Sequence, residues 1–296
     1  MSVFCSKILR ELYSLCFSDY IILHYKNLRT CRNKVNLHRY ISGIENNKPE
    51  TENLGDYLSN IVVKWLLKQK KIDFSTAKVN HKKHLYAIGS ILLMGYQKAT
   101  IWGSGMPYEP CFFRSFFHRD FFRKLDIRCC RGPLTRNTLL KLGHNCPEVY
   151  GDPAALMPLI YNPPKNKEFE FIIIPHYSKY FETKKEYCDG IVLNMETKNY
   201  KYVIDNICKA QKVISSSLHG LILAEAYGVP AIFYQDRPNR FNYKYEDWYL
   251  STGRNNCNCK TLTEAISFSN DNLLKLPNLE KMQKDLIDSF PYDLWS

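Results

Sequence analysis

Two histidines follow apolar runs of the sequence and are candidates for proton transfer. His219 follows residues 212–217, an apolar run that ends in consecutive serines, and His176 follows the apolar run 169–174 after one proline. Histidine is the side chain whose usual pKa lies closest to neutral pH, so it can donate or accept a proton there. We therefore predict that His219 and His176 are catalytic. The alternative for each is a buried histidine with a structural role.

The segment 212–234 that carries His219 predicts a strand, a serine-rich turn, a helix and a second strand. Apolar residues recur at helical spacing in its middle, and Gly228 ends the helix. The first N–H groups of a helix have no partner within it, so the hydroxyls of Ser216 and Ser217 can cap them and the turn can face an anion. Because ligands bind at the carboxyl ends of parallel strands, we predict that Ser216 and Ser217 hold a phosphate group.

Two arginines flank a second predicted turn between a strand and a helix. Arg131 ends the apolar segment 127–131, and Arg136 lies just inside the helix that follows Gly132 and Pro133. A guanidinium group binds a carboxylate or a phosphate with two parallel hydrogen bonds. Both arginines are therefore candidates for binding an anionic substrate. The alternative is a salt bridge between two domains.

Small and polar residues mark two further junctions. Asn53 and Asp56 lie between a polar loop and an amphipathic helix, and Gly103, Ser104 and Gly105 follow an apolar strand. Small residues at a strand end allow a ligand to approach backbone N–H groups. We predict that these five residues contact the substrate. For Asp56 the alternative is a helix N-cap.

The order of strand, turn and helix recurs in both halves of the chain. This repetition predicts an α/β fold with two Rossmann-like domains that face each other across a cleft. We expect an N-terminal segment over 1–45, a first domain over 46–158 and a second domain with the donor site over 159–276. A C-terminal helix within 277–296 is expected to cross back onto the first domain.

The charge balance predicts attraction to anions. The 296 residues include 41 Lys and Arg against 29 Asp and Glu, a formal net charge of +12. Nucleic acid, an anionic membrane and phosphorylated substrates are the classes that such a charge attracts. The basic residues are scattered, without a basic run or a recognition helix, which excludes nucleic acid as the expected partner.

The eleven cysteines do not form a disulfide framework or a metal site. Cys129 and Cys130 are adjacent, and Cys257 and Cys259 are separated by a single residue, which suits neither a bridge nor a zinc site. With no cleavable signal peptide, the pattern favours a reduced, cytoplasmic protein without a bound metal.

Apolar and basic residues mingle between residues 2 and 34. There is no run of about 18 apolar residues, so this segment does not read as membrane-spanning. A basic amphipathic segment of this kind can lie on the inner leaflet of a membrane. The alternative is a helix packed on the protein's own core.

Several of these motifs together resemble one family. The sequence Ser-Ser-Ser-Leu-His-Gly at 215–220, followed by Ala-Glu-Ala-Tyr-Gly-Val-Pro at 224–230, resembles the signature of the polysaccharide pyruvyltransferase family. Further motifs occur in the family's order: Asn53-Leu54-Gly55-Asp56, Gly103-Ser104-Gly105, Arg131-Gly132-Pro133-Leu134-Thr135-Arg136, Gly151-Asp152-Pro153-Ala154 and Pro175-His176. The chain departs from the family at Ser217, where many members have arginine.

The resemblance implies an enzyme that moves pyruvate from phosphoenolpyruvate onto a sugar of a capsule or exopolysaccharide precursor. It implies no cofactor, a hexose acceptor such as galactose that can be linked to a lipid pyrophosphate, and an arrangement similar to that of GT-B glycosyltransferases. His219 would be the principal acid or base, and His176 a second proton carrier or a sugar ligand. Lys244 would join Arg131 and Arg136 in binding the donor. Asp247 and Tyr249, in an expected loop, and Glu225 would contact substrate.

Two other functions fit the same residues. In a GT-B glycosyltransferase that uses a nucleotide sugar, Glu225 would bind the ribose hydroxyls. The protein could also be a membrane-bound assembly component without enzymatic activity. Ser217 in place of arginine would then indicate that the catalytic site has been lost. A comparison of the protein's affinities for phosphoenolpyruvate and for nucleotide sugars distinguishes the first alternative from pyruvyl transfer.

Overall fold

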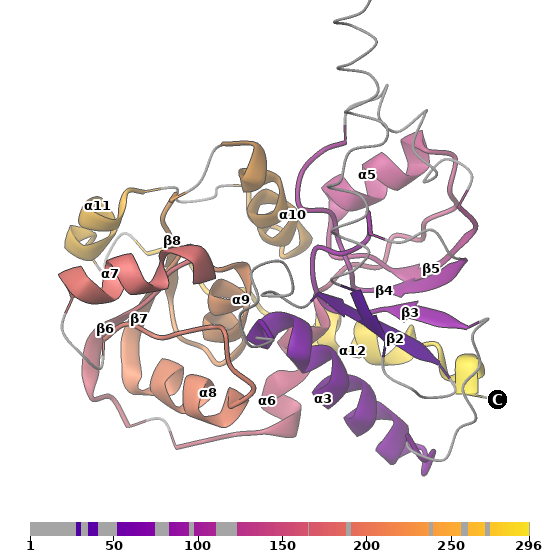
Figure 1. The fold of residues 1–296 in the computed structure, drawn as a ribbon, viewed down its shortest axis with the longest axis horizontal. Helices are drawn as coiled ribbons and strands as arrows, with labels where there is room; N and C mark the ends of the chain where they lie inside the picture. The colour runs from indigo at the N-terminus through magenta and orange to yellow at the C-terminus, as the bar shows by residue number, and fades with distance from the viewer. Residues whose placement is uncertain are drawn as a thin grey trace, which may run out of the picture.

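Two sheets of largely parallel strands form the framework of the molecule (Figure 1). The computed structural model describes residues 28–30, 35–40, 52–74, 83–94, 98–110, 123–164, 166–187, 191–236, 239–255, 260–269 and 273–295. Helices cover both sheets, so the protein has the mixed α/β fold with parallel sheets that was predicted from the alternation of strands and helices. That two domains face each other across a cleft stays a prediction.

The first sheet contains five strands in the order in which they occur in the chain. They are β1 (Leu28–Thr30), β2 (Asn36–Tyr40), β3 (His84–Tyr86), β4 (Ala99–Trp102) and β5 (Leu125–Cys129). β1 is antiparallel to β2, and the other neighbours are parallel. β1 and β2 lie within 1–45, so part of the expected N-terminal segment is sheet. The rest of that segment lies outside the described residues.

The second sheet contains β6 (Phe169–Ile174), β7 (Ala210–Ser215) and β8 (Ala231–Phe233), all parallel. A parallel bridge from Ile173 to Val192 extends the sheet beyond β6, and one from Tyr234 to Lys260 extends it beyond β8. Numbered along the chain, these five segments have the spatial order 2-1-3-4-5. This is the order of a doubly wound, flavodoxin-like sheet.

Alternate residues of these strands pack on opposite faces, as the two-residue period of a strand requires. Ile172 and Ile174 belong to the core that includes α8 (Tyr200–Lys209) and α9 (Leu218–Ala226). Ile173 and Ile214 belong to a separate core on the opposite face. That core is covered by α7 (Tyr180–Glu186) and α11 (Leu262–Ser267). Helices on both faces explain why the C-terminal halves of β6 and β7 have consecutive buried apolar residues.

A group of helices lies between the two sheets (Figure 1). It consists of α3 (Leu54–Gln69), the 3₁₀ turn η2 (Pro153–Leu156), α6 (Met157–Ile160) and α9. Their apolar residues belong to one core cluster that contains side chains from both halves of the chain. The halves are therefore joined by apolar packing. Among the described helices, none is both long and apolar enough to cross a bilayer.

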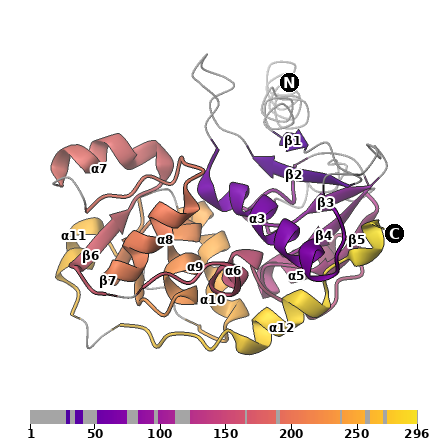
Figure 2. The same cartoon turned by 90° about the horizontal axis from the view of Figure 1, so that it is seen from below.

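The C-terminal helix returns to the first half of the chain. α12 (Glu280–Asp288) and η6 (Tyr292–Trp295) lie on the side of the first sheet (Figure 2). The Trp102 indole donates a hydrogen bond to the Leu286 carbonyl at 2.9 Å, and the Gln283 amide donates to the Ala155 carbonyl at 2.8 Å. The predicted crossing of the last helix is thus confirmed.

The 3₁₀ turn η4 (Asn239–Asn242) leads into the helix α10 (Tyr243–Ser251). α10 packs against α5 (Pro133–Lys141) of the first half. The stretch after residue 236 was predicted as a loop, and this was wrong for residues 243–251, which are helical. Its aromatic residues are buried on neighbouring elements, which stabilises the helix despite its mixed composition.

A buried ion pair fastens α10 to α9. The Glu225 carboxylate, 4% exposed, accepts hydrogen bonds from both terminal nitrogens of Arg254 at 2.6 and 2.7 Å and from the Trp248 indole at 2.7 Å. The Arg254 guanidinium also lies 4.6 Å from the centre of the Tyr249 ring. Glu225 is thus a structural anchor in this arrangement: both its oxygens are engaged, and it has almost no exposed surface for a ribose.

We expect Glu225→Ala to lower the free energy of unfolding by about 3–5 kcal/mol, because it leaves the largely buried Arg254 without its counter-ion and the buried Trp248 indole without its acceptor. Urea denaturation measures this loss. The matched control is Lys281→Ala, which removes an exposed ion pair to Asp285 and should cost roughly 0–1 kcal/mol. Equal, small effects of the two changes would contradict the anchoring role.

Candidate functional site

The carboxyl ends of β6, β7 and β8 bring polar side chains from three strands to one edge. His176 follows β6, Ser216 and Ser217 follow β7, and Asp236 follows β8. With the strand order 2-1-3-4-5, the chain winds in opposite directions from β6 and β7. Such a topological switch point is where open α/β sheets bind ligands. We call this edge, with the helix start that carries His219, the switch-point site.

His219 lies against the start of α3 from the other half of the chain. A Cβ atom at Gly55 would overlap the His219 ring, so only glycine lets the imidazole rest on this backbone. The Asn53 side chain accepts a hydrogen bond from the Gly55 N–H at 3.1 Å, which fixes the turn as the N-cap of α3. The N-termini of α3 and α9 therefore meet at one imidazole.

Asp152 supplies a carboxylate to the same imidazole. His219 Nε2 lies 3.5 Å from Asp152 Oδ2, and among the described residues neither atom has a hydrogen-bond partner. His219 is 7% exposed and Asp152 is fully buried. The other oxygen, Oδ1, accepts a hydrogen bond from Ala154 N–H at 3.0 Å, which caps η2 and fixes the carboxylate. The result is an oriented acid–histidine pair.

Asp152 was not predicted as a site residue, although it lies in a motif that was recognised. Its local signal is that of an ordinary cap, an aspartate directly before a proline that begins a helical turn. Gly55 was likewise quoted only as part of a motif. What makes both residues part of the site is their contact with His219, which lies far from them in the sequence.

Hydrogen bonds tie His176 to its neighbours at the switch-point site. Its backbone N–H donates to Ser216 Oγ at 2.7 Å, and its Nδ1 lies 2.9 Å from Ser178 Oγ. The Ser216 hydroxyl donates in turn to Asp236 Oδ2 at 2.5 Å. The predicted capping of α9 by Ser216 and Ser217 was wrong. The Ser216 hydroxyl is bonded to Asp236, and the Ser217 side chain makes no cap hydrogen bond. Instead, Ser215 Oγ accepts from Ser217 N–H at 3.0 Å.

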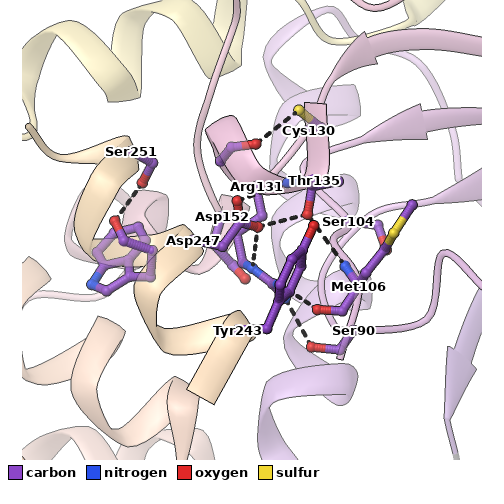
Figure 3. A network of polar contacts seen from close by, with 12 residues as sticks. Ser90, Ser104, Met106, Cys130, Arg131, Thr135, Asp152, Tyr243, Asp247 and Ser251 are labelled. Atoms are coloured by element: carbon purple, nitrogen blue, oxygen red, sulfur yellow. Dashed lines mark hydrogen bonds and ion pairs between the residues drawn. The ribbon is translucent and has the colours of Figure 1, made fainter. Parts of the chain in front are cut away.

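Arg131 lies at the centre of a buried network (Figure 3). It has no exposed surface, and its Nε donates to Asp247 Oδ2 at 3.1 Å. Its two other nitrogens donate to Ser90 Oγ at 2.8 Å and to the Met106 carbonyl at 2.6 Å. All three nitrogens are therefore engaged. This is the salt bridge between the two halves that was the alternative to donor binding.

Asp247 has a second task, because it caps α5. The N-cap position of α5 is Gly132, which has no side chain to use. Asp247 Oδ1 accepts from the backbone N–H of Thr135 at 3.0 Å, and Oδ2 accepts from the Thr135 hydroxyl at 2.6 Å. Nearby, burial raises the pKa of the Tyr243 hydroxyl, which lies 2.9 Å from Thr138 Oγ1. Asp247 thus joins α10 to α5 and has no surface for a sugar.

The turn over residues 103–105 faces protein atoms. A Cβ at Gly103 would overlap Pro153, one at Gly105 would overlap the Arg131 guanidinium, and Ser104 Oγ donates to the Gly89 carbonyl at 2.9 Å. The small residues therefore admit η2 and Arg131, and not a ligand, to close contact with the backbone.

The remaining predicted contacts are spread over several places. Asp56 is buried in the first turn of α3, directly after Gly55, and its carboxylate lies against Gly89. Arg136 donates to the Cys146 carbonyl at 3.1 Å, Lys244 lies 4.8 Å from the centre of the Tyr245 ring, and Tyr249 is buried under Arg254. The structure thus groups Asn53 and Asp56 with the switch-point site and places the arginines elsewhere.

The first turns of α3 and α9 lie beside His219, and the N-terminus of a helix carries roughly half a positive charge. Such ends bind phosphate and carboxylate groups. At α3 the first N–H groups are already bonded, Leu54 N–H to the Met195 carbonyl and Gly55 N–H to the Asn53 side chain. The described residues contain no cluster of three or more metal-binding side chains.

We expect Arg131→Met to lower the free energy of unfolding by about 3–5 kcal/mol, because it leaves Asp247 buried and without a counter-ion. Adding Asp247→Leu should cost less than the sum of the single changes, which a double-mutant cycle measures by urea denaturation. The control is Arg128→Met, whose ion pairs are exposed. Unchanged stability together with lost donor binding would make Arg131 a ligand of the donor after all.

One family model agrees with the motifs around His219. The model of the family described as polysaccharide pyruvyl transferase matches residues 53–235. An uncharacterized protein of Acanthamoeba polyphaga mimivirus is 23% identical over 212 residues, which cover 69% of this chain and 68% of that protein. A solved structure of a functionally uncharacterized protein from Klebsiella pneumoniae subsp. pneumoniae is 16% identical. It aligns over 80% of this chain and 92% of that one, with a TM-score of 0.49. By the extent of the family match, the chain belongs to the polysaccharide pyruvyl transferase family.

Proposed function

We propose that the protein transfers pyruvate from phosphoenolpyruvate to two hydroxyl groups of a sugar, so that a cyclic ketal forms on a surface-polysaccharide precursor. The sugar is a hexose such as galactose, which can be carried on a lipid pyrophosphate at the inner face of the membrane. One observation carries the proposal: the buried His219–Asp152 pair lies where two helix N-termini meet, in a chain of this family.

The reaction needs proton transfer and anion binding but no redox step. A proton is added to the methylene carbon of phosphoenolpyruvate, and a sugar hydroxyl bonds to the neighbouring carbon. The bond from that carbon to the phosphate oxygen breaks, and a second hydroxyl takes its place. Of the two hydroxyl protons released, one ends on the new methyl group and the other on phosphate. No nucleotide or other cofactor is required by this balance.

His219 is suited to pass these protons. The Asp152 carboxylate, held by its cap on η2, faces Nε2 and orients the ring, so that the imidazole is placed to give a proton to the methylene carbon. The ring then accepts a proton from an attacking hydroxyl, so it returns to its starting state. Because both groups are almost fully buried, little water competes for the proton.

The N-termini of α3 and α9 are suited to hold the donor's phosphate and carboxylate groups. Arg131 is committed to Asp247, and position 217 has serine where the family commonly has arginine. Backbone N–H groups and helix dipoles therefore supply the positive potential in this chain. We assign no part in donor binding to Arg136 or Lys244, which contact other elements.

The alternative of a nucleotide-sugar glycosyltransferase has less support. It relied on Glu225 to bind the ribose, and the Glu225 carboxylate is paired with Arg254 and Trp248. Equilibrium binding of phosphoenolpyruvate and of nucleotide sugars to the purified protein distinguishes the two functions directly.

We expect His219→Gln to lower kcat for phosphate release from phosphoenolpyruvate by about 10²–10⁴-fold, the usual contribution of an acid or base. Donor affinity should change far less, because the lost interaction acts in the transition state. Asp152→Asn should lower kcat in the same direction by a smaller factor. The assay uses radiolabelled phosphoenolpyruvate with a panel of lipid-linked galactose and N-acetylhexosamine acceptors.

The control for this experiment is His144→Gln, which removes a partly exposed histidine next to α5 and should leave kcat unchanged. Thermal unfolding of each variant separates lost chemistry from lost structure. Equal losses of kcat and donor affinity in His219→Gln would point to a binding role and refute acid/base catalysis by this residue.

A further inference from the structure

Asp236 brings a carboxylate to the switch-point site that has no role in the steps described above. It follows β8, is partly exposed, and its Oδ2 accepts the short hydrogen bond from Ser216 Oγ at 2.5 Å. A hydrogen bond to an ionised carboxylate is stronger than one between neutral groups. Asp236 is thus a negative charge held in a defined orientation at the edge where ligands bind.

A chain of hydrogen bonds fixes this orientation across three strand ends. Because Ser216 Oγ accepts the His176 N–H at 2.7 Å, its own proton is directed to Asp236. Ser216 is fully buried, and its carbonyl accepts a hydrogen bond from the Tyr245 hydroxyl at 2.5 Å. Ser216 can therefore move little, and its hydroxyl has no proton left for a phosphate oxygen.

The chemistry of this edge differs from that around His219. A carboxylate accepts hydrogen bonds from hydroxyl groups, but it repels the phosphate and carboxylate of phosphoenolpyruvate. Lys179 is near enough for Asp236 to add to its raised pKa, but the main cause is its hydrogen bond to Glu182, at 2.7 Å. After β6, the partly exposed Tyr177 ring lies 4.3 Å from the buried His176 ring, and an aromatic face suits the apolar side of a sugar ring.

We propose that Asp236, oriented by Ser216 beside His176, binds the hydroxyl groups of the acceptor sugar. The ends of β6 and β8 then form the acceptor side of the site, and the helix N-termini at His219 form the donor side. Ser216 becomes a positioning residue, in place of its predicted role as a phosphate ligand. That the bound sugar is the acceptor of pyruvate rests on the proposed function. Binding of a neutral sugar by Asp236 can be tested whether or not that function is correct.

The test measures binding of methyl glycosides of galactose, glucose and N-acetylglucosamine by saturation-transfer NMR, with and without phosphoenolpyruvate. The wild-type protein should bind at least one of them. Asp236→Asn should weaken that binding by about 10–100-fold, the effect of losing a hydrogen bond to a charged group. Affinity for phosphoenolpyruvate should stay the same or rise, because a negative charge has been removed.

The matched control is Asp205→Asn. Asp205 also accepts a hydrogen bond from a hydroxyl group, that of Tyr161 at 2.7 Å, and is also partly exposed, but it lies on α8. This change should leave both affinities as in the wild type. Ser216→Ala keeps the Asp236 charge but removes its orientation, and it should weaken sugar binding without weakening phosphoenolpyruvate binding. Thermal unfolding confirms that each variant is folded.

Three results would overturn the proposal: no glycoside binds to the wild-type protein, Asp236→Asn leaves glycoside binding unchanged, or Ser216→Ala weakens donor binding alone. The last result would restore Ser216 as a phosphate ligand. If glycoside binding depends on Asp236 but phosphoenolpyruvate neither binds nor releases phosphate, the acceptor site stands and the proposed pyruvyl transfer fails. The two ideas are therefore tested separately.

Discussion

The absence of a side chain at residue 55 is the constraint on which the site depends. Since Gly55 has no Cβ, the His219 ring rests directly on the first turn of α3. That contact brings the N-terminus of a helix from the first half of the chain to the N-terminus of α9 in the second. The start of η2 with its capping aspartate completes the arrangement. Any larger residue at this position would displace the His219 ring from its place on α3.

The basic residues of the chain are used in a different way from what its net charge suggests. Arg131 and Arg254 are both bound to buried carboxylates, and each pair fastens α10 to a neighbouring helix. A buried charge is costly unless it is paired and hydrogen-bonded, so these arginines are not available to a substrate. For the anionic donor that we propose, positive potential would come from groups that need no counter-ion. The unpaired N–H groups at helix starts are such groups.

The two sides of the switch-point site have opposite chemistry. Near His219 the protein presents helix N-termini and an imidazole, whereas at the ends of β6 and β8 it presents Asp236, His176 and Tyr177. Ser216 lies between them, and its hydrogen bonds connect all three strand ends. Under the proposed function, in which a highly charged donor and a neutral polyol bind at the same time, this separation is an advantage. The α/β framework achieves it because adjacent parallel strands end at the same edge.

Local patterns in the sequence were sufficient for the elements of the fold. The apolar runs and the cap and stop residues predicted β6, β7, α9 and the final helix, because these signals act within a few residues. The same signals placed His176 and His219 at strand ends. They failed for residues 243–251, where packing of aromatic residues on other elements makes a helix of what was predicted as a loop.

The partners of the predicted residues were decided only by the tertiary structure. Arg131 precedes Asp247 by more than a hundred residues, and no local pattern shows whether a guanidinium faces a substrate or a buried carboxylate. Asp152 has the sequence of a common helix cap, and Gly55 that of a common turn. They become parts of the site because strand order and helix packing bring them to His219. The sequence alone thus determined which residues can do chemistry and on which elements they lie. Which of them meet was settled by long-range packing, since such contacts leave no periodic signal along the chain.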